Sequence, residues 1–152
     1  MNRITLTVNG AKHFVDVEDE TLLLDVLREK AGTTSVREGC GVGACGACTV
    51  LSGGMSVSSC LALAVRHDGA EITTAEGLDE NDEVVSSFVD CNAAQCGYCI
   101  PGFVLMSREL LAENPHPSEQ EITDHLEGNI CRCGTYPEIK RAVAAAAERR
   151  SR

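Results

Sequence analysis

Residues 39–50 read Gly-Cys-Gly-Val-Gly-Ala-Cys-Gly-Ala-Cys-Thr-Val and contain Cys40, Cys45 and Cys48, and Cys60 follows after eleven intervening residues. In this C-x4-C-x2-C spacing, a loop wraps a 2Fe-2S cluster and the last ligand, here Cys60, is expected to arrive from a following strand. The glycines between the cysteines allow positive φ, so that backbone N–H groups can point at the cluster sulfurs. The stretch therefore predicts an iron-sulfur site and a sheet domain that carries it.

Strand-like patterns on both sides of this loop indicate a β-grasp sheet. Apolar and polar residues alternate in two runs joined by the tight turn Asn9-Gly10, which predicts a hairpin. Thr21 is placed to cap a helix after the hairpin, and Gly32 stands where a left-handed C-cap belongs. A hairpin followed by a helix packed across it begins a β-grasp sheet of the ferredoxin kind. The expected strands cover residues 4–8, a run ending at residue 17, and residues 49–51, 55–59 and 71–74, with the helix over residues 22–27.

The second half of the chain has a helical pattern. Beyond a polar segment at residues 75–82, the hydrophobic period rises from two to about 3.6 residues, which indicates a domain boundary in this segment. Ser118 and Glu121 have the spacing of a helix capping box. We expect an α+β chain: a β-grasp 2Fe-2S ferredoxin-like domain over residues 1–76 and an all-α four-helix 2Fe-2S-binding domain over residues 77–152. The helices are expected around residues 84–89, from Pro101 to before Pro115, from Ser118 through Ile130, and from Pro137 into the Ala-rich tail.

A second cysteine quartet lies in this helical half. Cys96 and Cys99 are separated by two residues and precede the helix that Pro101 opens. Cys131 and Cys133 are separated by one residue and lie between the third and fourth expected helices. Two helix junctions can thus meet around one cluster, where unsatisfied N–H groups and positive helix ends favour thiolates. The spacing therefore predicts a second 2Fe-2S cluster.

Zinc is the alternative for each quartet, since four-cysteine zinc sites are common. Zinc sites favour two separated two-cysteine knuckles over a glycine-rich wrap, so iron is favoured for the first quartet. A one-residue gap between Cys131 and Cys133 is unusual for zinc but not forbidden, and two quartets in one chain favour redox chemistry. Cys91 is left over and is expected to be a buried, inert thiol. The four histidines lack ligand-like spacing and are expected at the surface or in turns.

Composition and charge restrict the class of protein. The chain has 23 acidic and 13 basic residues and a formal net charge of -10, which disfavours nucleic acid and anionic membrane surfaces as partners. The amino terminus alternates like a strand and lacks the apolar run of a signal peptide, and no segment is long and apolar enough to span a bilayer. A cytoplasmic location is therefore expected, where nine cysteines are better explained by metal than by disulfides.

Three motifs together resemble a known family. They are residues 39–50, the run Gln95-Cys96-Gly97-Tyr98-Cys99-Ile100-Pro101-Gly102 and the run Asn129-Ile130-Cys131-Arg132-Cys133. Over nearly its whole length, and at all eight ligand positions, the chain resembles the small iron-sulfur subunit of the molybdenum hydroxylases, the xanthine dehydrogenase and aldehyde oxidase family. Many members continue the last motif as Cys-Thr-Gly-Tyr. Here it reads Cys133-Gly134-Thr135-Tyr136, which resembles branches that oxidise N-heteroaromatics or aldehydes.

The resemblance implies an electron-transfer subunit of a larger oxidoreductase. A large subunit would hold molybdopterin, with the cytosine dinucleotide as one form, and electrons would leave through two 2Fe-2S clusters to FAD in a medium subunit. The implied assembly is a dimer of heterotrimers. Gln95 would hydrogen-bond the pterin, and Cys133 would be the ligand closest to its amino group. For Gln95 alone, an amide that only caps backbone is the alternative.

Two other functions stay open at this point. The first is a free-standing two-cluster ferredoxin that serves diffusible partners, against which the extra helical domain argues. The second is a zinc-stapled interaction module. No residue of this chain is expected to act as a general acid, base or nucleophile, so the substrate site would lie on another chain. The expected metal ligands are Cys40, Cys45, Cys48, Cys60, Cys96, Cys99, Cys131 and Cys133.

Overall fold

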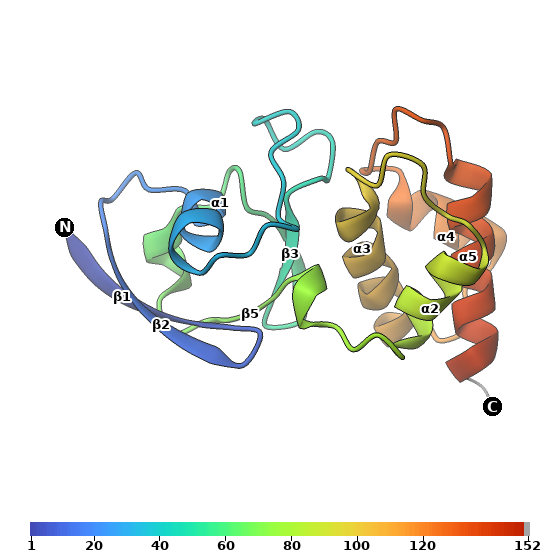
Figure 1. Ribbon diagram of the computed structural model, residues 1–152, viewed down its shortest axis with the longest axis horizontal. Coiled ribbons are helices and arrows are strands. Elements are labelled where there is room, and N and C mark those ends of the chain that lie inside the picture. The colour runs from blue at the N-terminus through green and yellow to red at the C-terminus, as the bar shows by residue number, and fades with distance from the viewer. Residues whose placement is uncertain (151–152) are drawn as a thin grey trace.

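The computed structural model describes residues 1–150, which form a sheet-containing part followed by a helical part (Figure 1). The first part has a five-stranded sheet in the order β2-β1-β5-β3-β4. Each part has its own hydrophobic core. The elements of the first part are β1 (Asn2–Val8), β2 (Ala11–Val17), α1 (Leu23–Asp25), the π-helix η1 (Val26–Lys30), β3 (Thr49–Ser52), β4 (Met55–Ser58), the 3-10 turn η2 (Ala64–His67), β5 (Glu71–Thr73) and the 3-10 turn η3 (Ala75–Gly77).

The expected hairpin and the mixed sheet are confirmed. Asn9 and Gly10 have φ of 50° and 82°, the left-handed values that a tight two-residue hairpin turn requires. Val8 pairs with Ala11 across this turn, and β1 also pairs in parallel with β5. Every second residue of β1 from Ile4 to Val8 is buried, so the period of two seen in the sequence places one face of the strand in the core.

The expected helix after the hairpin differs from the structure in detail. Its α-helical part is only three residues long and continues as η1, in which the Ala31 N–H bonds to the carbonyl of Val26. The Thr21 hydroxyl does not cap this helix, because it accepts a hydrogen bond from the N–H of Glu18 instead. Gly32 has φ of 73° and ends the turn as expected.

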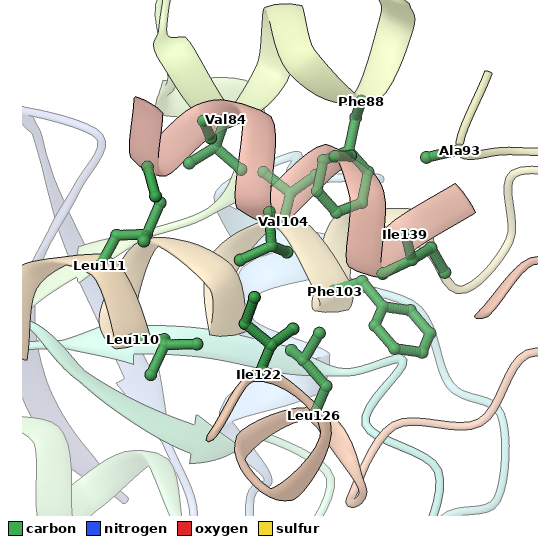
Figure 2. Packing of buried hydrophobic residues seen from close by; sticks show 14 of the residues in the cluster. Val84, Phe88, Ala93, Phe103, Val104, Leu110, Leu111, Ile122, Leu126 and Ile139 are labelled. Atoms are coloured by element: carbon green, nitrogen blue, oxygen red, sulfur yellow. The ribbon is translucent and has the colours of Figure 1, made fainter. Parts of the chain in front are cut away.

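The helical part contains α2 (Glu83–Asp90), α3 (Ile100–Glu113), α4 (Glu119–Leu126) and α5 (Tyr136–Arg150). Figure 2 shows Phe88, Phe103 and Ile139 pointing into the space between these helices. The Ser118–Glu121 capping box is present at the start of α4. The expectation that this helix extends through Ile130 is wrong: α4 ends at Leu126, and the Ile130 side chain is half exposed.

Helix α3 joins the two parts, because it packs on β3, β4 and η3 as well as on the other helices. Glu109 of this helix is buried, and its Oε1 accepts a 2.5 Å hydrogen bond from the N–H of Ser56 in β4, an edge strand of the sheet. Its Oε2 lies 3.2 Å from Nε2 of His125 in α4. His125 is therefore half-buried between elements and not a surface or turn residue as expected. The contacts of α3 bring the two cysteine regions together.

Candidate metal centres

The first quartet is built by the loop before β3 and by the segment after β4, so Cys60 lies in a turn just past that strand and not in the strand as expected. Cys48 and Cys60 are buried, while Cys40 and Cys45 are half-buried. The N–H groups of Val42 and Ala44 donate to the Cys40 sulfur at 3.4 and 3.2 Å. These two bonds lower the pKa of Cys40 to about 6, because they stabilise the thiolate.

Glycines make this loop possible. Gly43 has φ of 72°, and a Cβ there would lie 2.4 Å from the Leu61 side chain. A Cβ at Gly39 would lie 2.7 Å from the sulfur of Cys45. The loop thus folds tightly around its own sulfurs, as the glycine pattern predicted.

The second quartet lies where two helix junctions meet. Cys99 is the N-cap residue of α3, with Cys96 just before it, and the pair Cys131 and Cys133 lies between α4 and α5. The Tyr98 N–H bonds to the Cys96 sulfur and lowers the pKa of this exposed thiol.

Cys131 and Cys99 are the buried members of the second quartet, and their pKa values are shifted in opposite directions. Burial raises the pKa of Cys99 to about 12. Burial also opposes ionisation of Cys131, but hydrogen bonds from Thr135 prevail and lower its pKa to about 7. The Thr135 hydroxyl lies 3.0 Å from the Cys131 sulfur. Gly134 has φ of 80°, and this left-handed turn of the backbone brings the Thr135 hydroxyl next to the Cys131 sulfur.

The thiols within each quartet lie close enough to influence one another's ionisation. In the first quartet Cys48 and Cys40 both act on Cys60. In the second quartet Cys133 and Cys131 both act on Cys96. Within residues 1–150, no three His, Cys, Asp or Glu side chains are gathered closely enough to hold one metal ion.

The arrangement of the four thiols in each quartet bears on which metal group the residues fit. A zinc ion needs four ligands at one tetrahedral point, whereas a 2Fe-2S cluster spreads four thiolates over two irons. Burial raises the pKa of Cys60 to about 11, so a nearby metal cation is needed to hold this thiol ionised, and the glycine-rich wrap of the loop favours a cluster over zinc. The residues present therefore fit a 2Fe-2S cluster in each quartet.

The two cysteine loops touch through residues that the sequence did not single out as functional. Nη1 of Arg37, which precedes the first quartet, donates to the carbonyls of Gly97 and Tyr98 at 2.6 and 3.0 Å. The Tyr98 hydroxyl donates in return to the Glu38 carbonyl at 2.6 Å. These residues join loops that are about sixty positions apart, and only the basic and aromatic character of Arg37 and Tyr98 could have drawn attention to them.

A second contact lies between the two quartets. The amide of buried Asn129 donates to the Gly46 carbonyl at 3.4 Å, and the Ile130 N–H donates to the Cys45 carbonyl at 3.0 Å. Gly102 in α3 packs against the same backbone, because a Cβ on it would lie 2.2 Å from the Gly46 oxygen. The two ligand loops are therefore in direct contact.

The remaining expected residues take the following positions. Gln95 is exposed, and its side-chain N–H donates to the Cys133 carbonyl at 3.4 Å. Cys91 lies outside both quartets, at the C-cap of α2, where it packs partly buried against the helical core. In the part of the chain from Met1 to Arg150, no helix is long and apolar enough to cross a membrane.

Comparisons with known proteins give a consistent result. Residues 6–75 match the family model of the 2Fe-2S iron-sulfur cluster binding domain, and residues 74–144 match that of the [2Fe-2S] binding domain. The chain is 45% identical over 154 residues to the nicotinate dehydrogenase small FeS subunit of Eubacterium barkeri, with 98% of each chain covered. It is 41% identical over 142 residues to the nicotine 6-hydroxylase small subunit of Paenarthrobacter nicotinovorans, covering 92% of this chain and 86% of that one.

Solved structures agree. A chain of quinoline 2-oxidoreductase from Pseudomonas putida 86 superposes with a TM-score of 0.92 at 42% identity, covering 98% of this chain and 96% of that one. The aldehyde oxidoreductase from Desulfovibrio desulfuricans gives 0.94 at 39% identity, and this chain spans 17% of its length. The α+β fold and the resemblance seen in the sequence are confirmed. The chain belongs to the family of small iron-sulfur subunits of the molybdenum hydroxylases and is a subunit of an oxidoreductase.

Proposed function

We propose that this subunit carries single electrons from a molybdopterin centre on a large subunit, through a cluster in the second quartet and then one in the first, to FAD on a medium subunit. The observation that carries the proposal is the direct contact of the two ligand loops, in which the Ile130 N–H donates to the Cys45 carbonyl. A continuous path of backbone and one hydrogen bond thus joins Cys131 to Cys45. A 2Fe-2S cluster takes one electron at a time, so two in series would divide the two electrons of substrate oxidation into single steps.

The eight cysteines of the two quartets are the proposed ligands. We place the boundary between a ferredoxin-like domain, residues 1–76, and a helical cluster domain, residues 77–152. The two hydrophobic cores support this division.

Exposed apolar side chains next to each quartet support two partner faces. Ile130 and Tyr98 are exposed beside the second quartet, close to the exposed Cys96 and Gln95. We place the large molybdopterin subunit there, with Gln95 hydrogen-bonded to the pterin and Cys133 nearest its amino group. The molybdopterin would be the plain or the cytosine dinucleotide form.

A second apolar face lies beside the first quartet. Val42 and Leu61 are 67% and 58% exposed there, and they are neighbours of the first-quartet cysteines in the chain. We place the medium FAD subunit on this face. The complete enzyme would be a cytoplasmic dimer of heterotrimers without nucleic-acid or membrane partners.

The substrate would be selected on the large subunit. The relatives named for nicotinate, nicotine, quinoline and aldehydes support an N-heteroaromatic or an aldehyde. The order Gly134-Thr135 after the second quartet is part of the same proposal about the substrate class. In the structure this order places the Thr135 hydroxyl beside the Cys131 sulfur.

The test is to isolate the native complex without oxygen and measure metal, sulfide and subunits together. About four irons and about four acid-labile sulfides per chain are expected, with two EPR signals after reduction. The chain should elute from size-exclusion chromatography with a large and a medium subunit. Zinc without sulfide would instead indicate the structural module, and an iron-loaded chain that elutes alone would indicate a free ferredoxin.

A further inference from the structure

Arg37 belongs to the first cysteine loop by sequence, but its guanidinium serves the second loop. Nη1 lies 2.6 Å from the Gly97 oxygen and 3.0 Å from the Tyr98 oxygen. The guanidinium carbon is 5.3 Å from the centroid of the Tyr98 ring, a cation–π distance. Arg37 is half-buried, so water screens its charge less than that of a free surface arginine.

The peptide unit between Gly97 and Tyr98 transmits this contact to a ligand. Its carbonyl accepts the hydrogen bond from Arg37, and its N–H, on Tyr98, bonds to the Cys96 sulfur. A cation on the carbonyl polarises the peptide and strengthens the bond that its N–H donates. Arg37 therefore acts on Cys96 in two ways: through its own positive charge and through the N–H that points at the sulfur.

Both effects favour the more negative state of a cluster held by Cys96. Adding an electron increases the negative charge on the cluster sulfurs, and hydrogen bonds and nearby cations stabilise that charge. Tyr98 fixes the geometry, since its hydroxyl is bonded to the Glu38 carbonyl, next to Arg37 in the chain. The arrangement is thus held from both loops.

We propose that Arg37 is a positioning residue that raises the reduction potential of the second-quartet cluster, so that this cluster accepts electrons readily from the molybdenum side. The inference rests on the proposed function and goes beyond it, because it names a residue that shifts the potential of one of the two clusters. Arginine suits this role better than lysine, since its planar guanidinium can lie over the Tyr98 ring while Nη1 donates to both carbonyls.

The experiment is a redox titration of the intact complex followed by EPR, which reports each cluster separately. In Arg37→Gln, the one-electron distribution should move roughly threefold to tenfold away from the second-quartet cluster, which equals ~28–59 mV at 59 mV per tenfold. The first-quartet signal should move less. Arg28→Gln is the matched control, since Arg28 also donates to two backbone carbonyls, those of Thr34 and Val36, but has no bond to the second loop. It should leave both potentials in place.

Arg37→Lys completes the test. It keeps a cation, so its second-quartet potential should lie closer to the wild-type value than to that of Arg37→Gln. If Arg37→Gln does not assemble the cluster, Arg37→Lys should still assemble it and should move the one-electron distribution less than about threefold from wild type, and a larger shift would overturn the proposal. An unchanged second-quartet potential in Arg37→Gln, or equal shifts in the Gln and Lys variants, would overturn the proposal. Loss of that cluster in both variants would also overturn it, because Arg37 would then only retain the cluster. A wild-type complex without iron and sulfide would contradict the proposed function itself. A wild-type complex with both clusters, and Arg37 variants with unchanged potentials, would leave the proposed function intact and overturn only this inference.

Discussion

The backbone N–H of Ile130 donates a 3.0 Å hydrogen bond to the carbonyl oxygen of Cys45. Ile130 directly precedes Cys131 in the chain. The hydrogen bond therefore connects the backbone next to a second-quartet cysteine with the backbone of a first-quartet cysteine. The neighbouring Asn129 amide donates to the Gly46 carbonyl beside it. The two ligand loops therefore form one unit, and a change that separates their backbones should disturb both.

Gly102→Ala tests how closely α3 must approach this unit. The added Cβ would lie 2.2 Å from the Gly46 oxygen and 3.2 Å from the Asn129 amide nitrogen, and backbone cannot yield as a flexible side chain can. We expect the free energy of unfolding of the iron-loaded chain to fall by about 1–3 kcal/mol, although alanine favours a helix more than glycine does. Gly128→Ala is the control, since a Cβ there meets nothing within 4 Å. Equal urea denaturation midpoints for the two variants would show that the close approach does not matter.

The loop of the first quartet could be predicted from the sequence because its signal is local. The glycines between Cys40 and Cys48 decide the loop conformation, whereas ligation of a metal by the two quartets stays a prediction. The hairpin at Asn9-Gly10 is equally local, since the turn residues and the alternation fix its register.

Contacts between distant segments could not be predicted in this way. Arg37 and Gly97 are sixty positions apart, and Ser56 and Glu109 are fifty-three apart, so no spacing rule links them. Ile130 fits the helical period after Leu126, but the chain leaves the helix and its N–H bonds to Cys45 instead. There a tertiary hydrogen bond overrides the local pattern.

Glu109→Ala tests the link between α3 and the sheet edge. The change removes the carboxylate that accepts from the Ser56 N–H and faces His125, and it leaves a partly buried N–H without this acceptor. We expect a loss of about 1–3 kcal/mol in the free energy of unfolding, measured by denaturant titration. Glu113→Ala, at the exposed end of the same helix, should change it by less than about 0.5 kcal/mol. Similar losses for both would contradict the role of Glu109.

Glu76→Gln tests a pH-dependent contact between η3 and the loop before the first quartet. Burial raises the pKa of Glu76, but hydrogen bonds from the Ser35 and Thr74 hydroxyls and the Ser35 N–H prevail and hold the pKa below its usual range. A lowered carboxyl pKa stabilises the fold above the unfolded value of about 4.3, and this contribution is lost as the pH falls through the folded pKa.

The stability difference between wild type and Glu76→Gln should therefore be larger at about pH 6 than at about pH 3.5. Glu20→Gln changes an exposed carboxyl in the turn after β2 and serves as the control. Its difference from wild type should stay within about 0.5 kcal/mol at both pH values. A Glu76→Gln difference that does not change with pH would show that these hydrogen bonds do not depend on the charge of Glu76.

Cys45→Ser tests the proposed electron route, with Cys91→Ser as its matched control. The thiol of Cys45 belongs to the first quartet, and its carbonyl accepts the hydrogen bond from the Ile130 N–H. Cys91 lies outside both quartets and packs against the helical core. A serine hydroxyl is a far poorer iron ligand than a cysteine thiolate, so the first-quartet EPR signal should be lost or strongly altered while the second remains. Turnover of the complex with external acceptors should stop, because electrons that reach the second quartet have no onward carrier.

Cys91→Ser should keep both signals and full turnover, with a small loss of stability from the half-buried position. Normal turnover in a Cys45→Ser complex that lacks the first-quartet signal would mean that electrons leave the subunit without passing through that quartet.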